Sequence, residues 1–451
     1  MLVIRKLAIG LISTIIACTT AAPVITVRPG DAGDIIITED NTLNATAPAP
    51  VPDDAAAVQI SSDFEKAATN GRLPLSLVNN FGGGQVNAYI TGLDAGGRLV
   101  MLQPNGKFYF PTADRAVAAP RRITANTAIP LGAKGSTTRI TIPGYISSAR
   151  IYFAEGRLDF YTIFNTALNA PSLVEPSAVN PLDPSAGVNW GFVELTNIQK
   201  GGLYANISYV DFVGLVLGMK LESGGGRIQV TEGLKANAVT AICSELKAQG
   251  RKDGQPWGDL CMVNKAGKPL RVLAPSNYVA SKPTAFKNYW TQYIDQVWTQ
   301  YARTPLTINT QAGPGEVKCT VSNGQLKCNG DNRGYNKPTA HDLFGCNSGP
   351  FGILAGDNDV HKAVVPRLCA AFHRGTLLQT GGHIQPGMAA DKYYTSTPTN
   401  WYSKFVHQYE VDGKGYAFPY DDVNPAVGVD QAGVVADPDP KLLTVVVGGP
   451  L

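Results

Sequence analysis

The sequence predicts a mainly β protein in which an α/β subdomain is inserted into, or leans against, a β-barrel or β-sandwich domain. Short apolar runs separated by turn residues fill the first half of the chain, whereas helical spacing begins only near residue 233. Glycine and proline contribute 48 and 31 of the 451 residues, well above their combined average of about 12%. That composition favours many turns joining short strands.

The first residues are typical of a secretory signal peptide. Arg5 and Lys6 precede an apolar run over 7–17, which ends in small residues at 19–22. A membrane-spanning helix needs about 20 apolar residues, and this run is about half as long. We therefore expect a signal peptide over residues 1–21 and a secreted, extracellular protein that does not enter the membrane.

Residues 22–57 are expected to form a disordered leader or a pro-segment. They are rich in alanine, proline, threonine and aspartate, and they hold too few large apolar residues to bury a core. A glycosylation sequon occurs there at Asn44. We exclude this segment from the fold.

The β domain is expected over residues 58–234 and 411–451. Its strand-like runs are 73–78, 86–91, 99–102, 138–142 and 149–153, with closing runs at 415–419 and 442–447. Three glycines at 82–84 lie between two runs. A strand follows them rather than the helix that a dinucleotide-binding loop requires, so we interpret them as a turn.

The α/β subdomain is expected over residues 235–410. Apolar spacing predicts one helix that ends at Gly250 and others over 360–372, where Pro366 would kink or split the helix, and over 401–408. Aromatic residues repeat at helical spacing from Phe286 to Tyr301. Such a stripe could stack on sugars, but at this spacing we interpret it as core.

Seven cysteines occur, and Cys18 lies in the expected signal peptide. An even set in an oxidising compartment implies disulfide bonds, although six cysteines allow about 15 pairings. We favour nearest-neighbour pairing, which closes three local loops. Zinc is the weaker interpretation because no two cysteines are as close as a zinc motif requires. The pairs that we favour are Cys243 with Cys261, Cys319 with Cys328, and Cys346 with Cys369.

Charge and motifs exclude several functions. Charged residues make up 16% of the chain and the net charge is +3, so nothing indicates a nucleic-acid partner, and such a surface suits a neutral, hydroxyl-rich ligand. The chain has no GxSxG elbow, which a lipase-like serine mechanism would use. Its five histidines show no HExxH spacing, and we expect them to be structural or at the surface.

Two strand-like segments each carry one acid among apolar and aromatic residues. Alternation places Trp190, Phe192 and Glu194 on one face of the first, and Asp211 lies in the second. Glycosidic cleavage needs one protonated and one ionised carboxyl group. Burial beside aromatic rings would favour the protonated form of Glu194. Spacing alone favours the alternative, in which both acids are exposed ends of half-buried strands.

The segments Phe192–Thr196 (FVELT) and Tyr204–Gly214 (YANISYVDFVG) resemble the paired signature of glycoside hydrolase family 64, the thaumatin-like endo-β-1,3-glucanases. The similarity extends from about Leu73 to the C-terminal region, including Tyr416–Val423 (YAFPYDDV). This resemblance implies a fungal-type secreted enzyme with a thaumatin-like β-barrel domain and an α/β subdomain that form a wide groove. It implies laminaripentaose-type products from β-1,3-glucan.

The resemblance also implies an inverting mechanism without a cofactor. Carried over residue by residue, Glu194 becomes the general acid and Asp211 the general base. The main alternative is a non-catalytic thaumatin-like protein that binds β-glucan in cell walls. In either case we expect a monomer with no nucleic-acid or membrane partner. Asp421 and Asp422 could form a pair that faces the cleft, but we interpret them as a solvated turn.

One calculation resists this assignment. A tight hairpin over 197–202 would place Glu194 opposite residue 206, and Asp211 would then lie about 17 Å further along the strand. Inverting enzymes keep their carboxyl groups about 6.5 to 9.5 Å apart. The two strands must therefore be bulged, curled or not directly paired.

Polar and aromatic residues around the two acids are expected to bind the sugar. Trp190 would stack on a ring, and the others would bond to hydroxyl groups. Asn206 also begins a glycosylation sequon, which we expect to be unoccupied because a glycan there would crowd the groove. The expected substrate-binding residues are Trp190, Thr196, Asn197, Asn206, Ser208 and Tyr209.

Overall fold

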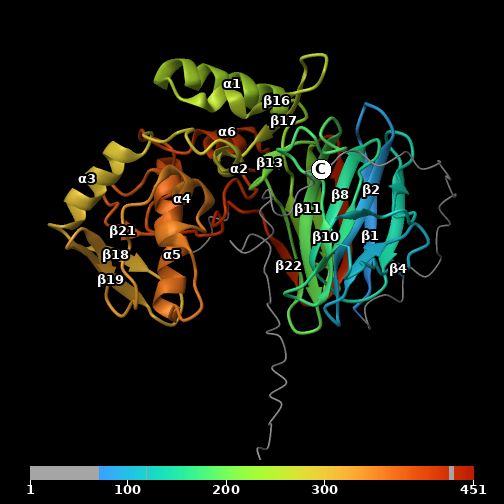
Figure 1. Cartoon of the computed structure of the whole chain (residues 1–451), viewed down its shortest axis with the longest axis horizontal. Helices are drawn as coiled ribbons and strands as arrows, with labels where there is room; N and C mark the ends of the chain where they lie inside the picture. The colour runs from blue at the N-terminus through green and yellow to red at the C-terminus, as the bar shows by residue number, and fades with distance from the viewer. Residues whose placement is uncertain (1–70, 118, 426–430) are drawn as a thin grey trace, which may run out of the picture.

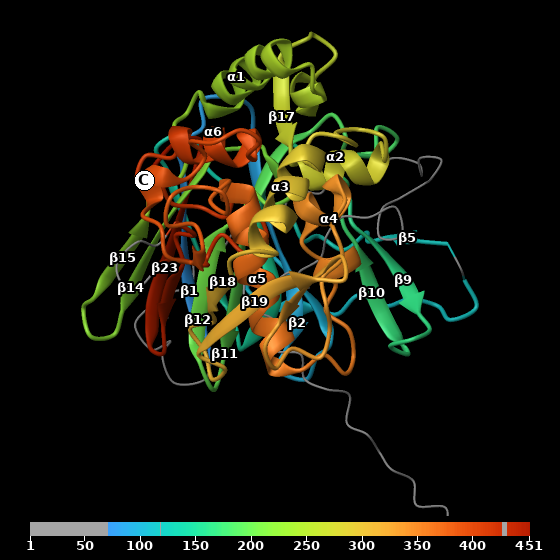
Figure 2. The ribbon, with the colours of Figure 1, turned by 90° about the vertical axis from the view of Figure 1, so that its left-hand side faces the viewer.

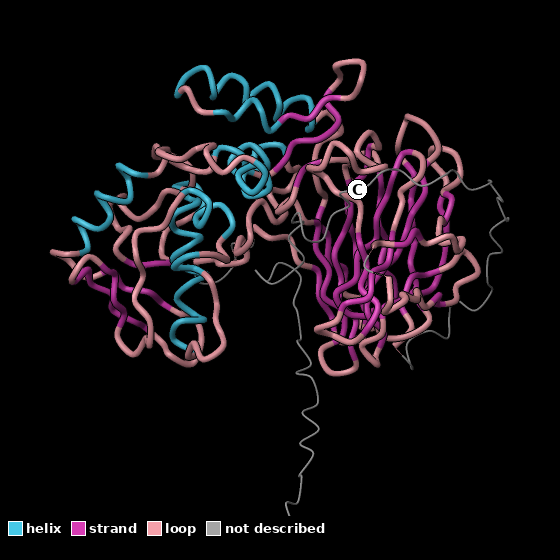
Figure 3. The backbone as a smooth tube through the Cα atoms, viewed as in Figure 1, coloured by secondary structure: helices cyan, strands magenta, loops and turns pink. Residues whose placement is uncertain are grey.

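The computed structural model describes residues 71–117, 119–425 and 431–451. The expected signal peptide, the leader and Asn44 lie outside these ranges. A β-rich part contains the first and last described strands, and a smaller part with most of the helices lies beside it (Figure 1). Figure 3 shows the same division, with strands concentrated in the larger part.

One large sheet carries Glu194, and the chain that leaves its strand β12 leads to Asp211. Its order is β22-β12-β11-β8-β2-β3-β4, with β6 beside β2, and its neighbours are antiparallel. The strands are β2 (Val86–Asp94), β3 (Leu99–Leu102), β4 (Phe108–Tyr109), β6 (Ile129–Pro130), β8 (Ile146–Glu155), β11 (Asn189–Ile198), β12 (Gly202–Ile207) and β22 (Val435–Asp437).

A second large sheet has the order β15-β14-β23-β1-β7, and its strand β14 lies against β11 and β12 of the first. The final strand runs parallel to β1 and antiparallel to β14, so the end of the chain returns to the β-rich part as expected. The thaumatin-like barrel stays a prediction. The strands are β1 (Leu73–Asn79), β7 (Thr137–Ile142), β14 (Leu217–Ser223), β15 (Ile228–Thr231) and β23 (Pro440–Val447).

A small sheet, β10-β9-β5, stands apart from β14 and β15 at the opposite side of the molecule (Figure 2). It comprises β5 (Arg121–Arg122), β9 (Tyr161–Asn165) and β10 (Ala170–Val174). Strand β10 matters for the site because the chain runs from its end, through a long connection, into β11.

The helical part holds two further sheets, β13-β17-β16 and β20-β19-β18-β21. The helices are α1 (Ala238–Asp253), α2 (Pro275–Ser281), α3 (Thr291–Tyr301), α4 (Ala340–Gly345), α5 (Asp359–Arg374) and α6 (Trp401–Tyr409), with 3₁₀ turns at Pro256–Leu260, Gly349–Phe351 and Ala390–Lys392. The strands are β13 (Phe212–Val213), β16 (Cys261–Val263), β17 (Pro269–Leu273), β18 (Leu306–Asn309), β19 (Glu316–Ser322), β20 (Gln325–Cys328) and β21 (Ile384–Gln385). The domain boundaries that we expect stay a prediction.

Several element ends differ from the sequence-based expectation. Helix α1 continues through Gly250 and ends at Asp253, and the next residue, Gly254, takes the left-handed conformation typical of a helix end. Phe286 has a φ of 55°, so α3 begins only at Thr291. Helix α5 stays continuous through Pro366 because its flanking apolar residues are buried. Residues 415–419 form bends and a turn with one isolated β-bridge, from Tyr416 to Ser208, rather than a strand.

The core and the disulfides agree with expectation. The aromatic stripe is buried, with Trp290 and Tyr301 at 1% and 0% exposure. The cysteines are joined in the nearest-neighbour pairs, which link α1 to β16, β19 to β20, and α4 to α5. No helix within the described ranges is long and apolar enough to cross a membrane.

Candidate active site

Glu194 lies in the middle of the first large sheet. The register of β11 places it opposite Arg150 on β8 and opposite Asn206 on β12. Residues directly opposite each other in antiparallel strands point to the same face. Glu194 therefore has a guanidinium group on one side and an amide on the other, and the predicted hairpin register is confirmed.

Asp211 reaches the same place by another route. Strand β12 ends at Ile207, and the Leu215 amide then donates to the Trp190 carbonyl oxygen at 3.0 Å. The chain has therefore left the sheet and returned to β11. The expectation that the second acid-bearing segment is a strand is therefore wrong at Asp211, because backbone contacts outside the hairpin bend the chain here.

Arg150 joins the two acids. Its Nη2 atom lies 3.0 Å from Glu194 Oε1 and 3.5 Å from Asp211 Oδ2. These two oxygens are therefore no further apart than the sum of the two distances. An extended hairpin would separate the residues by about 17 Å. The curled chain thus removes the conflict, and it brings these two oxygens to within about 6.5 Å of each other, the sum of 3.0 and 3.5 Å, which is at or below the lower end of the inverting range of about 6.5 to 9.5 Å.

A third acid shares the same guanidinium group. Glu175 follows β10 directly, and its Oε2 atom lies 2.9 Å from Arg150 Nη1. Tyr152 donates a hydrogen bond to the other Glu175 oxygen, and the Arg150 guanidinium lies 4.4 Å from the centre of the Phe192 ring. Three carboxylates thus surround one cation that is itself buried.

Sequence reasoning missed Arg150, Tyr152 and Glu175. A signal existed for the first, because Arg150 is a charged residue inside the apolar run 149–153. An acid in a connection, such as Glu175, carries no such signal. Asn277 on α2 was also missed. Its Nδ2 atom donates to the Asp211 carbonyl oxygen at 2.9 Å and lies 3.4 Å from Asp211 Oδ1.

Burial controls the charge of Asp211. Glu194 and Asp211 are 6% and 4% exposed, so both lie almost wholly inside the protein. Desolvation raises the pKa of Asp211 to about 6; the nearby Arg150 opposes this rise, and Glu194 adds to it. In the free protein, Asp211 therefore holds a proton at mildly acidic pH.

Trp190 does not offer a sugar-stacking surface in this structure. It is 1% exposed, and its ring packs at 4.5 Å from Phe212 and at 5.9 Å from Tyr152. The Arg271 guanidinium lies 5.5 Å from the same ring. Trp190 instead forms part of an aromatic wall that keeps the acids away from water.

The other predicted substrate-binding residues are also buried, but they differ in their partners. Asn206 is fully buried, and neither atom of its amide has a hydrogen-bond partner among the described residues. Asn197 donates to the Gly71 carbonyl oxygen at 2.9 Å, and the Tyr209 carbonyl oxygen accepts from the Tyr402 hydroxyl at 2.6 Å. Asn206 is thus the best placed of the three for a ligand. The substrate roles of Thr196, Asn197, Asn206, Ser208 and Tyr209 stay predictions.

Asp421 is fully buried, so the expected solvated turn is wrong for this residue. Its carboxylate lies 3.0 Å from Arg374 Nη2 and 2.9 Å from His407 Nε2, and His407 Nδ1 lies 2.8 Å from Glu410. Two cations thus compensate the buried acid. The Tyr416 carbonyl oxygen, at the start of this turn, accepts from the Tyr209 amide, so the network supports the segment that leads to Asp211.

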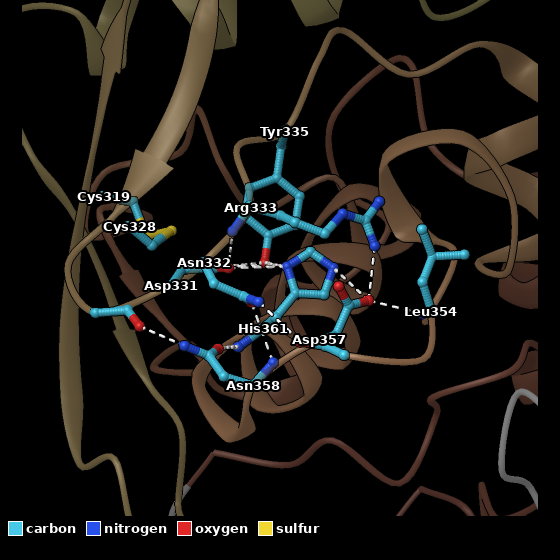
Figure 4. A network of polar contacts seen from close by, with 12 residues as sticks. Cys319, Cys328, Asp331, Asn332, Arg333, Tyr335, Leu354, Asp357, Asn358 and His361 are labelled. Atoms are coloured by element: carbon cyan, nitrogen blue, oxygen red, sulfur yellow. Dashed lines mark hydrogen bonds and ion pairs between the residues drawn. A yellow bond between two sulfur atoms is a disulfide. The ribbon is translucent and has the colours of Figure 1, made fainter. Parts of the chain in front are cut away.

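A second buried network surrounds His361 in the helical part (Figure 4). His361 Nδ1 lies 3.0 Å from Asp331, and its Nε2 faces Asp357 at 3.7 Å. Asp357 also pairs with Arg333 at 2.6 Å. These contacts tie the loops on either side to the start of α5 and give His361 a structural role.

Cys346, Cys369 and His373 are close enough to suggest a metal site. However, the two sulfur atoms are joined in a disulfide. His373 Nε2 lies 2.7 Å from the Leu343 carbonyl oxygen, and the Asn400 amide lies 2.8 Å from His373 Nδ1. All three residues already have protein partners, so they do not form a ligand set for a metal.

Comparison with known proteins finds two curated relatives by sequence. A glucan endo-1,3-beta-glucosidase of Arthrobacter sp. (strain YCWD3) is 27% identical over 283 residues, which are 61% of this chain and 48% of that protein. A protein of the same name from Cellulosimicrobium cellulans is 26% identical over 283 residues. The chain therefore spans about half the length of the curated relatives that it matches.

Solved structures extend the comparison over most of the chain. A laminaripentaose-producing beta-1,3-glucanase in complex with laminaritetraose has a TM-score of 0.73 and 27% identity, and the match covers 84% of this chain and 99% of that one. A beta-1,3-glucanase domain from Clostridium beijerinckii shares the fold, with a TM-score of 0.65, 22% identity and the same coverage. Residues 71–447 match the sequence profile of the beta-1,3-glucanase family. The chain belongs to glycoside hydrolase family 64.

Proposed function

We propose that this protein is an inverting endo-β-1,3-glucanase that releases short laminari-oligosaccharides, with Glu194 and Asp211 as its catalytic carboxyl groups. The observation that carries the proposal is their convergence. Two acids from separate segments meet at Arg150, within 3.0 and 3.5 Å of one nitrogen atom. Family membership and the activity named for the relatives support the same reaction.

Within this proposal, the family resemblance makes Glu194 the general acid and Asp211 the general base. In the free protein, however, Glu194 is hydrogen-bonded to Arg150, while the pKa of Asp211 is raised to about 6. The proton must therefore be on Glu194 by the time the leaving oxygen departs. The assigned roles therefore require the proton to pass from Asp211 to Glu194 after glucan binds.

The first experiment measures release of reducing ends from laminarin. Glu194→Gln and Asp211→Asn should each lose most turnover, because an inverting enzyme needs both groups. Binding of insoluble β-1,3-glucan should remain, since neither change removes apolar surface. Near-normal turnover in either variant would remove that residue from the mechanism.

A second measurement separates the two roles. A β-laminari-oligosaccharyl fluoride has a leaving group that needs no proton donor. Glu194→Gln should therefore cleave it at close to the wild-type rate, whereas Asp211→Asn should not. The reverse result would exchange the roles of acid and base. Early NMR spectra of products from laminarin should show the α-anomer, and the β-anomer would exclude inversion.

The competing function is glucan binding without cleavage. It is favoured by one observation, namely that both side chains are almost covered in the free protein. Purified protein with its disulfides formed would then bind β-1,3-glucan but release no reducing ends. The proposal also includes secretion of a fungal-type enzyme, which N-terminal sequencing of protein from the culture medium would test.

A further inference from the structure

Glu175 occupies a fixed position beside the catalytic pair. It accepts from Arg150 Nη1 at 2.9 Å and from the Tyr152 hydroxyl, and its side chain is only 8% exposed. The connection that follows it is pinned to the helical part. Arg271 on β17 donates to the carbonyl oxygens of Ala186 at 3.0 Å and of Val188 at 2.5 Å.

A second set of contacts shapes this connection from within. The Asp183 carboxylate accepts from the Ser177 amide at 3.0 Å and from the Ser185 amide at 2.7 Å. Ser177 lies two residues after Glu175. Its hydrogen bond to Asp183 therefore fixes the backbone next to Glu175 and keeps the Glu175 carboxylate beside Arg150. Glu175 is therefore not a residue of an exposed loop, because its side chain is buried and its backbone is fixed.

We propose that Glu175 is a positioning residue that holds the Arg150 guanidinium between Glu194 and Asp211 and, through Arg150, sets the ionisation of the catalytic pair. This inference rests on the proposed hydrolase function. Arg150 can offer only part of its charge to the pair, because Glu175 binds the opposite edge of the same guanidinium. Glu175 is thereby a third acid that neither donates nor accepts the proton of the reaction.

Charge compensation explains why this matters. A carboxylate near a cation ionises more readily, and a carboxylate near another anion ionises less readily. Burial is the largest cause of the raised pKa of Asp211. Arg150 is the nearby cation, which lowers this pKa, and Glu194 and Glu175 are the nearby anions, which raise it. Removing the charge of Glu175 removes a repulsion and frees Arg150 for the pair. Both effects lower the pH at which the pair ionises.

The titratable groups around the pair come from several elements. Arg150 and Tyr152 lie on β8, Glu194 on β11, and Glu175 after β10. Tyr402 on α6 faces Asp211 from the helical part and stays neutral, since burial raises its pKa well above the ordinary value. Arg271 on β17 lies over the Trp190 and Phe212 rings, and burial lowers its pKa to about 10, so it stays charged throughout the relevant range. Among these groups, Glu175 is the one acid that binds Arg150 without belonging to the pair.

The test is the pH profile of kcat/KM for laminarin hydrolysis by the full chain. Glu175→Gln keeps the size of the side chain and an acceptor for Arg150 but removes the charge. We expect the midpoints of the profile to move to lower pH by about 1 unit, the lower end of the range for a single nearby charge. A purely structural role would reduce the rate or the stability and leave the midpoints in place.

Two further variants keep the test decisive. Glu175→Asp withdraws the charge by one methylene group, so its midpoints should move in the same direction by less, and it carries the test if Glu175→Gln does not fold. Asp357→Asn is the matched control, because it breaks the buried pair with Arg333 in the other network and should leave the midpoints unchanged (Figure 4).

Unmoved midpoints in the folded Glu175 variants would overturn this inference alone. Absence of hydrolysis by the wild type would instead remove the proposed function, and this inference with it.

Discussion

Asp211→Asn should make the protein more stable at neutral pH while it removes turnover. The pKa of Asp211 is raised from 3.8 to about 6, chiefly by burial. A raised folded-state pKa means that the ionised form is less favourable in the folded protein than in the unfolded chain. The wild type is therefore most stable, with respect to this group, below pH 3.8, and it loses stability as the pH rises through about 6.

The size of the effect follows from that shift. The two pKa values differ by roughly two pH units, and one unit corresponds to about 1.4 kcal/mol. Ionisation of Asp211 thus lowers the free energy of unfolding by up to about 3 kcal/mol at pH 7.5. Asparagine has nearly the same shape and keeps an oxygen for Asn277, so the substitution removes the charge with little other change. We expect a gain of about 1 to 3 kcal/mol at pH 7.5 and almost none at pH 4.

The assay is urea unfolding of wild type and variant at these two pH values. Glu194→Gln is the comparison, because Glu194 accepts two hydrogen bonds from Arg150, at 3.0 and 3.2 Å. Its neutral replacement weakens charge-assisted bonds and should lower the unfolding free energy by about 1 kcal/mol at pH 7.5. Opposite signs for two neighbouring acids would be hard to obtain from general effects of charge removal.

A specific result would refute this reasoning. If Asp211→Asn were no more stable than the wild type at pH 7.5, the carboxylate would be adequately compensated by Arg150, and desolvation would not control it. A gain of equal size at both pH values would point to packing rather than charge.

Two other predictions concern parts outside the catalytic pair. Burial lowers the pKa of His407, but the carboxylates of Glu410 and Asp421 outweigh this effect and raise the pKa to about 10. The stabilising contribution of His407 is therefore complete below about pH 6.5 and is lost as the pH rises through 10. Thermal melting should show a falling midpoint between about pH 6.5 and pH 10, and the same curve for His407→Gln should be lower at neutral pH and flatter over this range. Asn206 is fully buried, so peptide mass mapping should find it unmodified even in a host that glycosylates sequons; a glycan on it would contradict the packing around Glu194.

The sequence predicts the local parts of this fold well. The strands of the first half, the buried aromatic stripe and the nearest-neighbour disulfides all depend on spacing within a short stretch of chain. The hairpin register that pairs Glu194 with Asn206 is of the same kind, because a short turn fixes it. Element ends were less accurate where one residue decides them, as at Gly254 and Phe286.

The site itself depends on contacts that spacing does not encode. The approach of Asp211 follows from the bend after Ile207, and Tyr416 holds that bend from more than two hundred residues further along the chain. Arg150 was visible as a charge within an apolar strand. Its three carboxylate partners could be assigned only once the strand register and the connection carrying Glu175 were known.

The two acids are held by different parts of the molecule. Glu194 is fixed by β8 and β12 within the large sheet, whereas the Asp211 carbonyl oxygen accepts from the Ala274 amide at 2.9 Å and from Asn277 at 2.9 Å, both in the helical part. A displacement of the helical part relative to the sheet therefore changes the separation of the acids without breaking any strand pair around Glu194. Because the nearest oxygens of the two carboxyl groups are at most about 6.5 Å apart in the free protein, the sum of 3.0 and 3.5 Å, an outward movement of the helical part would bring them into the range that admits a water molecule. On this view the catalytic distance is a property of how the two parts dock, and Asn277→Ala, which removes a side-chain bond to Asp211, should alter turnover more than it alters the fold of either part.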